Sequence, residues 1–314
     1  MLRLVAIRLT HAIPILLIIA VLAFLLMQLL PGDPAVLMAG DGASAEAIQQ
    51  IRERLQLDRP VWQQLLSWMG HLLSGDLGSS LTLNQTVVSA VAERLPVSLS
   101  LAVVSMIITV PVGILLGVVA AATRDSWIDA AVMAVALLGV SVPSFWIAIL
   151  SVILFSVTLG WLPSAGYVPL SDGVVPWLLA LLQPAIVLAL FQVGFLARMT
   201  RSAMLDVLDQ DFIRTARAKG VPPLRVLWKH GFRNTLIAVL TVIGYIFSLL
   251  IGGSVIVEQV FALPGVGRLV VQAVLARDYP LVQGTLLLFG FIFVLINIAT
   301  DILYIVVDPR VRYD

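Results

Sequence analysis

The residues that could do acid–base, metal or phosphate chemistry are few in this chain of 314 residues. Lysine occurs only at Lys219 and Lys229, and neither belongs to the G-x-x-x-x-G-K-S/T pattern of a phosphate-binding loop. Histidine occurs only at His11, His71 and His230, which are too far apart for an H-E-x-x-H zinc motif, and cysteine is absent. The sequence therefore predicts no catalytic residue, no metal site and no cofactor, and we expect any ATP hydrolysis to occur on another chain.

The densest group of charges is the stretch RTARAKGVPPLRVLWKHGFRN, residues 214–234. It contains six of the 19 Lys and Arg residues and no acid, although only 12% of the chain is charged. Gly220 is placed to end one helix, and Pro222 and Pro223 are placed to begin another. The apolar stripe of this second helix would consist of Leu224, Leu227 and Trp228. The stretch therefore predicts a basic helix–turn–helix.

The residues before this turn also have a helical pattern. Thr200, Met204, Leu208 and Phe212 recur every four residues, which is the spacing of one helix face. We therefore expect a stiff helical segment that reaches Lys219.

The elements that must position this segment are membrane helices. Hydrophobic residues make up 60% of the chain and its mean hydropathy is +1.05, which is typical of a protein solvated by lipid. Windows free of Asp, Glu, Lys and Arg, each long enough for a helix to cross about 30 Å of hydrocarbon, occur six times. They are residues 12–30, 97–123, 130–161, 174–197, 235–257 and 281–300. The predicted fold class is an all-α membrane protein with six transmembrane helices.

Some residues in these windows predict bends and close contacts between helices. Pro111, Pro143 and Pro184 allow kinks, and the pair Gly113-x-x-x-Gly117 allows a neighbouring helix to approach closely. Outside the windows, residues 62–73 have the apolar spacing of an amphipathic helix. This helix would suit the headgroup layer, and it would equally suit a short cap on the helix bundle.

The basic residues predict the orientation of the chain in the membrane. With the N-terminus in the cytoplasm, thirteen Lys and Arg residues lie in cytoplasmic segments and six lie outside. We therefore expect both termini to be cytoplasmic, the loop 31–94 to be external and the loop 198–234 to be cytoplasmic.

The absence of charge inside the windows bears on the source of energy for transport. A proton- or ion-coupled carrier usually needs an ionisable group at membrane depth, and the windows contain none. A secondary carrier is therefore disfavoured but stays open as an alternative, as does a membrane scaffold without transport. A pore-forming scaffold that takes its energy from elsewhere is the preferred interpretation.

The basic loop resembles a known sequence pattern. Arg214, Thr215, Ala216, Arg217, Ala218, Lys219 and Gly220 align with the E-A-A-x-x-x-G coupling loop of importer permeases of the ATP-binding-cassette superfamily. The longer stretch DFIRTARAKGVPPLRVLWKHGFRN is similar to the form found in the dipeptide/oligopeptide/nickel branch of these permeases. Further segments similar to that branch are LLPGDPA (29–35), SGDLGSS (74–80), SVPSFW (141–146), GGSVIVEQVFALPGVGRL (252–269) and DPRVR (308–312).

The resemblance implies a type I importer permease fold and a permease subunit that forms half of a translocation pathway in a bacterial inner membrane. The implied partners are a second homologous permease in a heterodimer, two ATP-binding subunits, an external solute-binding protein and membrane lipid, with no nucleic acid. The implied ATPase-coupling residues are Arg214, Thr215, Ala216, Arg217, Ala218, Lys219, Gly220, Pro222 and Pro223.

The expected cargo and domain organisation also follow from this resemblance. Peptides are the favoured cargo, with nickel or other metal chelates and glutathione as alternatives. The expected domains are an N-terminal transmembrane helix (1–30), an external loop with the amphipathic helix (31–94), a transmembrane domain (95–304) that contains the coupling loop (198–234), and a cytoplasmic tail (305–314).

Overall fold

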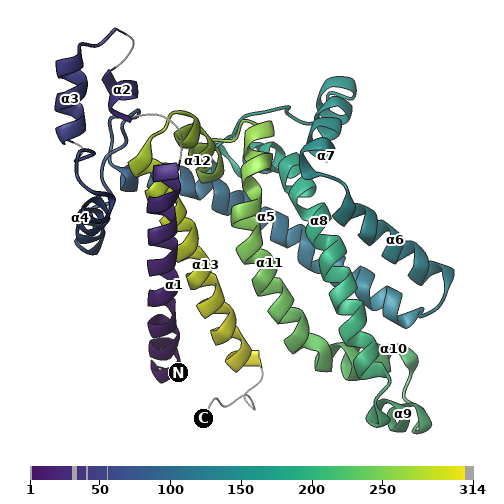
Figure 1. Ribbon diagram of the computed structural model, residues 1–314. Helices are drawn as coiled ribbons and strands as arrows, with labels where there is room; N and C mark the ends of the chain where they lie inside the picture. Colours follow the sequence, from purple (N-terminus) through teal and green to yellow (C-terminus); the bar gives the residue numbers. More distant parts are fainter. Residues whose placement is uncertain (1, 30–33, 40–41, 55, 308–314) are drawn as a thin grey trace. The chain divides into compact units, whose positions relative to one another are not determined.

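The computed structural model describes residues 2–29, 34–39, 42–54 and 56–307. These residues form helices and turns, with no strand among them. The elements are α1 (Leu2–Leu29), α2 (Pro34–Ala39), α3 (Ala45–Arg54), α4 (Val61–Leu73), α5 (Val87–Ala122), α6 (Trp127–Ser141), α7 (Ser144–Ser151), η1 (Val152–Thr158), η2 (Leu170–Asp172), α8 (Val174–Leu208), α9 (Asp211–Ala218), α10 (Pro223–Arg225), η3 (Val226–Phe232), α11 (Arg233–Val260), α12 (Val266–Leu275) and α13 (Tyr279–Val307). Figure 1 shows their course. The predicted all-helical class is confirmed for the described residues.

The long apolar helices correspond to the predicted windows. Within the described residues, four are long and apolar enough to cross a membrane: α5, α8, the continuous run Pro223–Val260, and Tyr279–Thr300 in α13. The third window is a bent pair, in which α6 meets the run Ser144–Thr158 at 97°. Pro143 caps α7 at this break, which confirms the kink predicted there. The described chain thus has four spanning helices, or five if the bent pair is one span, and α1 contributes a shorter apolar helix, Thr10–Leu26.

The chain divides into two compact units, which are described separately. Unit 1 comprises residues 1–96 and 265–294, and unit 2 comprises residues 97–264 and 295–314. The core of unit 1 joins the start of α5 to α12 and to the start of α13. Its buried residues are Val87, Ala90, Val91, Leu269, Ala273, Leu281 and Val282.

A buried carboxylate organises the polar part of unit 1. Asp278 is fully buried and caps α13, because its Oδ1 accepts a hydrogen bond from the backbone N–H of Leu281 at 3.2 Å. Its Oδ2 accepts from the hydroxyls of Ser80, at 2.5 Å, and Thr82, at 2.9 Å. These bonds fix the loop after α4 to the beginning of α13.

Helix α4 confirms the predicted amphipathic segment. The Trp68 ring lies 5.8 Å from the Phe24 ring of α1, whereas Trp62 and Leu66 are more than half exposed. One part of the apolar face therefore packs inside unit 1, and the other part remains exposed.

Unit 2 is built around α8, which lies between α6 and α11 (Figure 1). Glycines allow the closest approaches to this helix. A Cβ atom on Gly194 of α8 would lie 2.4 Å from the carbonyl oxygen of Ala136 in α6. A Cβ atom on Gly113 or Gly117 of α5 would lie 2.9 Å or less from atoms of α8. The close approach predicted from the Gly113-x-x-x-Gly117 pair is therefore confirmed.

The helices extend beyond the charge-free windows, so unit 2 includes ionisable residues at helix ends. Glu258 lies in the last turn of α11, is fully buried, and accepts hydrogen bonds from the hydroxyls of Ser98, at 2.7 Å, and Ser254, at 2.8 Å. Asp129 lies in the first turn of α6, and Arg201 lies near the end of α8. The windows marked the apolar centres of the helices correctly but not their ends.

Candidate coupling site

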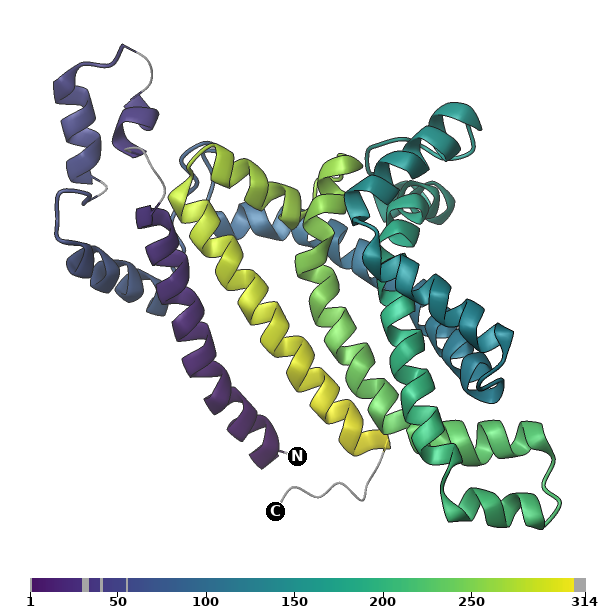
Figure 2. The same ribbon diagram turned by 45° about the vertical axis from the view of Figure 1, so that its right-hand side comes forward.

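The candidate site is the coupling hairpin, a name we use for residues 209–234, which follow α8. Figure 2 shows its two helical segments side by side at the end of α8. Ile213 and Ala216 of α9 and Val226 of the second segment are buried together, and Leu208 and Val221 pack against them. This small apolar cluster holds the two segments of the hairpin to each other.

The predicted continuous helix to Lys219 is wrong at one point. Helix α8 ends at Leu208, and α9 begins at Asp211. This break changes which face is buried, so that Ile213 is buried and Phe212 is 43% exposed. Thr200 and Met204, before the break, are fully buried as the four-residue spacing predicted.

The turn between the two segments has the predicted chemistry. Gly220 has a φ of +75°, the left-handed region that glycine adopts most readily. Its N–H donates to the Arg217 carbonyl at 3.0 Å, and the Val221 N–H donates to the Ala216 carbonyl at 3.2 Å. This pair of hydrogen bonds is a Schellman motif, which satisfies the last carbonyls of α9.

The second segment begins at the predicted prolines. Pro222 is the N-cap of α10, and Pro223 is its first residue. The run then continues through the π-helix η3 into α11, so one continuous helical segment connects the turn to a membrane span. The predicted stripe is only partly correct, because Leu224 and Trp228 are exposed while Val226 is buried.

The predicted coupling residues differ in their exposure to solvent. Ala216 is buried inside the hairpin. All the others are exposed: Arg214, Thr215, Arg217, Ala218, Lys219, Gly220, Pro222 and Pro223. The exposed cations Arg225, Lys229 and Arg233 extend the positive surface along the second segment. The hairpin therefore presents a basic surface that also carries the exposed aromatic side chains of Phe212 and Trp228.

The hairpin is attached to unit 2 through the end of α8. Met204 of α8 is buried with Val118 and Ala121 of α5, and Leu227 and Phe232 of the hairpin pack against them. The Thr235 hydroxyl lies 3.3 Å from the Met204 sulfur. The same small cluster therefore contacts α5, α8 and the second segment of the hairpin.

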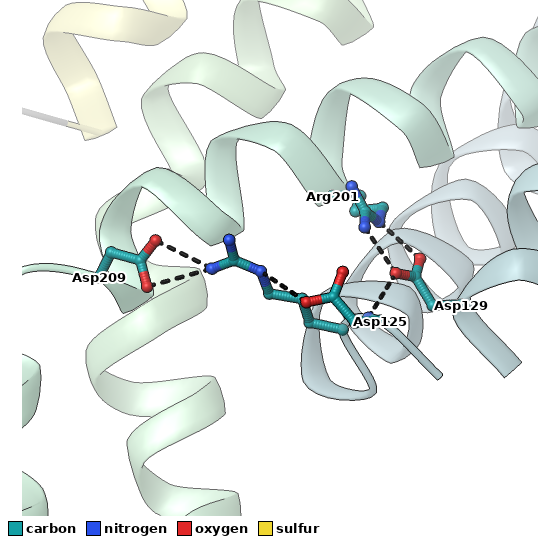
Figure 3. Close-up of polar contacts among 5 residues, drawn as sticks. Asp125, Asp129, Arg201 and Asp209 are labelled. Carbon is teal, nitrogen blue, oxygen red and sulfur yellow. Dashed lines mark hydrogen bonds and ion pairs between the residues drawn. The ribbon is translucent and has the colours of Figure 1, made fainter. Parts of the chain in front are cut away.

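Three ion pairs lie beside this attachment, and two of them join different helical segments (Figure 3). Arg201 of α8 donates from Nε and Nη2 to the two carboxylate oxygens of Asp129, at 2.6 and 2.5 Å. Arg124, in the turn between α5 and α6, donates from Nη1 to the two oxygens of Asp209, at 3.3 and 3.0 Å. Asp209 directly follows α8. The Arg201 pair therefore joins α8 to the first turn of α6, and the Arg124 pair joins the end of α8 to the turn before α6.

These pairs could not be predicted from the sequence, in which Arg124 and Arg201 are two of the thirteen cations in segments assigned to the cytoplasm. Their partners are 85 and 72 residues away in the chain, so no local pattern links them. A lone Asp in the first turn of a membrane helix was the one available signal.

The site has no arrangement suited to a metal ion. Within the described part of the chain, no three His, Cys, Asp or Glu side chains group in a way that could hold one. What the site offers is a shaped, basic protein surface joined to a membrane helix on each side.

Comparison with solved structures shows which fold this is. Two inward-facing structures of the MetNI methionine ABC transporter match with TM-scores of 0.54 and 0.59, at 23% and 20% sequence identity. The matches cover 71% and 69% of this chain, and 96% and 95% of the chains in those structures. The fold is therefore similar to that of the matched chains of this ABC transporter.

Comparison of sequences shows the family. Residues 113–313 match the family described as the binding-protein-dependent transport system inner membrane component, and residues 1–102 match the N-terminal family of the same systems. The chain belongs to this family. It is a permease component of an ABC importer in a bacterial inner membrane, which it crosses several times, and ATP hydrolysis takes place on separate subunits.

Several relatives match over nearly their whole length. A protein of Brucella abortus named as a peptide transport system permease is 65% identical over 307 residues, which are 98% of each chain. A peptide ABC transporter permease of Sinorhizobium fredii is 40% identical over 98% of each chain. A glutathione transport system permease of Salmonella choleraesuis is 44% identical over 100% of each chain.

Proposed function

We propose that this chain forms half of the translocation pathway of an ATP-driven peptide importer. A second, homologous permease would form the other half, two ATP-binding subunits would drive the cycle, and an external solute-binding protein would deliver the cargo. The observation that carries this proposal is the exposed basic hairpin on a chain that matches peptide permeases over nearly its whole length. A permease without its own nucleotide site needs such a surface to receive work from an ATPase.

The proposed arrangement in the membrane has six spans and two cytoplasmic termini. The four long helices, the bent pair and the apolar part of α1 supply six candidates. The excess of Lys and Arg in the segments assigned to the cytoplasm supports this orientation. We retain the proposed domains: 1–30 as the first span, 31–94 as the external loop, 95–304 as the transmembrane domain and 305–314 as the tail.

The proposed coupling residues have two different roles. Ala216 holds the hairpin together from inside, because it is buried against Ile213 and Val226. The exposed residues of the set, from Arg214 to Pro223, would lie against the ATP-binding subunit. Their positive charge would favour an acidic surface on that subunit and would contribute mainly to association and register.

Peptides are the proposed cargo. The relatives at 65% and 40% identity carry names of peptide permeases, and a relative at 44% carries the name of a glutathione permease. Glutathione is itself a small peptide, so one pathway chemistry serves both. Nickel or other metal chelates remain the alternative cargo from the same branch of permeases.

The test of this proposal is co-purification followed by transport. A tagged chain should purify with an ATP-binding subunit and a second permease, and the liposome-reconstituted complex should accumulate a labelled tripeptide only with ATP and the binding protein. Replacing both Arg217 and Lys219 with Gln should weaken the association with the ATPase by about tenfold, because two charges leave the contact surface. Arg59→Gln, an exposed cation in the loop assigned to the outside, is the matched control.

Two outcomes would contradict the proposal. Uphill uptake by the chain alone in liposomes would identify a secondary carrier. If the Arg217→Gln, Lys219→Gln double variant associates as the wild type does, the basic surface does not contribute to the contact with the ATPase. Its charge would then reflect only the excess of cations in cytoplasmic loops.

A further inference from the structure

The two ion pairs beside the coupling hairpin differ in their surroundings. The Asp129 side chain is 6% exposed and that of Arg201 is 24% exposed, so this pair is largely shielded from water. The side chains of Arg124 and Asp209 are 50% and 66% exposed. An exposed pair is screened by solvent, whereas removing one partner of a buried pair leaves the other charge uncompensated. The inner pair, Asp129 with Arg201, is therefore the stronger structural link.

The inner pair also has the geometry of a fixed joint. Both carboxylate oxygens of Asp129 accept from Arg201, in the two-point arrangement that a guanidinium makes and an ammonium does not. The backbone N–H of Asp125 donates to the same carboxylate at 3.1 Å, and the Asp129 N–H donates to the Ser126 hydroxyl at 3.3 Å. The carboxylate is thus held in one orientation at the start of α6.

The position of this joint relates it to the hairpin. Arg201 lies in the last part of α8, which ends at Leu208 and is followed after two residues by α9. Farther from the hairpin, α6 and α8 make two more close contacts, where Gly194 faces the Ala136 carbonyl and Gly139 faces the Leu190 carbonyl. Helices α6 and α8 are therefore in contact at several levels. A displacement of the end of α8 must either carry α6 with it or break the ion pair.

We propose that the Asp129–Arg201 ion pair makes α6 and α8 move as one body when the ATPase displaces the coupling hairpin. Both are positioning residues for ATP-driven transport: they act through α6 and α8 and touch neither ATP nor cargo. This inference rests on the proposed function, because it requires that the hairpin receives the movement. The outer pair, Arg124 with Asp209, contributes less because water screens it.

The test uses the full complex of this chain, the second permease, the ATP-binding subunits and the binding protein in liposomes. The measured quantity is the number of labelled tripeptide molecules accumulated per ATP hydrolysed. Arg201→Gln should lower this ratio by about tenfold while the complex still assembles and hydrolyses ATP, because the buried carboxylate of Asp129 loses its partner and α6 no longer follows α8. A purely structural role would lower assembly and ATP hydrolysis together and leave the ratio unchanged.

Control variants separate this effect from the mere loss of a charge. Arg198→Gln removes an exposed guanidinium of α8 that lies 5.9 Å from the Phe195 ring, and it should keep the wild-type ratio. Arg124→Gln, outside the hairpin, breaks the exposed pairs of Arg124 with Asp209 and Asp125 and should change the ratio less than twofold, as expected of surface pairs. The reversed pair, Asp129→Arg with Arg201→Asp, should recover part of the ratio lost in Arg201→Gln.

The outcomes of this test are decisive in either direction. A wild-type ratio in an assembled Arg201→Gln complex overturns the proposal. If Arg201→Gln prevents assembly, Arg201→Lys decides, since it keeps the charge and loses the two-point contact: a lowered ratio supports the joint, and a wild-type ratio overturns it. Failure of the underlying function is distinct, because then the wild-type complex itself shows no ATP-dependent uptake.

Discussion

Ala216 and Ala218 are two residues apart on α9, yet they have opposite surroundings. Ala216 is 9% exposed and packs with Ile213 and Val226, whereas Ala218 is exposed. A small apolar side chain is therefore required at residue 216 by the packing of the hairpin itself. At residue 218 the side chain is free to meet a partner subunit.

This difference predicts the effects of two matched substitutions. Ala216→Asp places a carboxylate in the apolar cluster, which costs on the order of 3 kcal/mol or more because the cluster offers it no counter-charge. We expect ATP-driven tripeptide uptake to fall to about a tenth or less, since loss of even half that energy would populate an unpacked hairpin. Ala45→Asp, at an exposed alanine of α3 outside the hairpin, should keep most of the uptake. The measurement is uptake normalised to the amount of chain in the membrane, and equal uptake by the two variants would contradict this account of Ala216.

Some features of individual residues could be predicted from the sequence, and others could not. The helix end at Gly220 and the helix start at Pro222 and Pro223 follow from local backbone chemistry, so the sequence predicts them well. The ion pair of Asp129 with Arg201 depends on how α6 packs against α8, which no short pattern encodes. The burial of Ala216 likewise depends on a contact with the second segment of the hairpin.

At the scale of helices, the centres of the membrane spans were predictable and their ends were not. A long charge-free run must be solvated by lipid or by protein, so it identifies α5, α8, α11 and α13. The ends depend on caps and on ion pairs that allow charged residues such as Asp129 and Glu258 to continue a helix. The break between α8 and α9 and the π-helical turns of η3 were likewise not predicted from the sequence.

The contact between α6 and α8 gives a prediction at this scale. Gly194→Ala would place a Cβ atom 2.4 Å from the Ala136 carbonyl oxygen, and backbone cannot yield as a flexible side chain can. The two helices must separate slightly, which costs about 1–3 kcal/mol, as overpacking typically does. We expect a clearly lower midpoint of thermal unfolding for the detergent-purified complex.

A glycine in open space is the control for this prediction. A Cβ atom on Gly70 of α4 would have no atom within 4 Å. Gly70→Ala should leave the unfolding midpoint unchanged or slightly raised, because alanine favours a helix by about 1 kcal/mol over glycine. An unchanged midpoint for Gly194→Ala would show that α6 and α8 are not in such close contact in the assembled protein.

At the scale of the whole molecule, the chain must receive work through a surface, because ATP hydrolysis occurs on separate subunits. A bound partner shifts a conformational equilibrium only by the difference between its affinities for the two conformations. In its proposed role as that surface, the hairpin would have to be stiff enough to present different contacts in the two states. Its internal cluster, its Schellman turn and its continuous connection to α11 meet this requirement.

The orientation of the molecule in the membrane is open to a direct test, because the chain has no cysteine and each introduced one can be labelled without background. Lys219→Cys in the hairpin and Asp125→Cys before α6 should react with a membrane-impermeant maleimide only when it has access to the cytoplasmic face. Ser171→Cys, after the bent pair, should react only from the outer face if that pair is one span. Labelling of residues 125 and 171 from the same face would instead make the pair bent by 97° a re-entrant loop, and the chain would then have fewer spans than proposed. Labelling of residue 219 from outside would place the hairpin beyond the reach of any cytoplasmic ATPase, and the coupling proposal would be wrong.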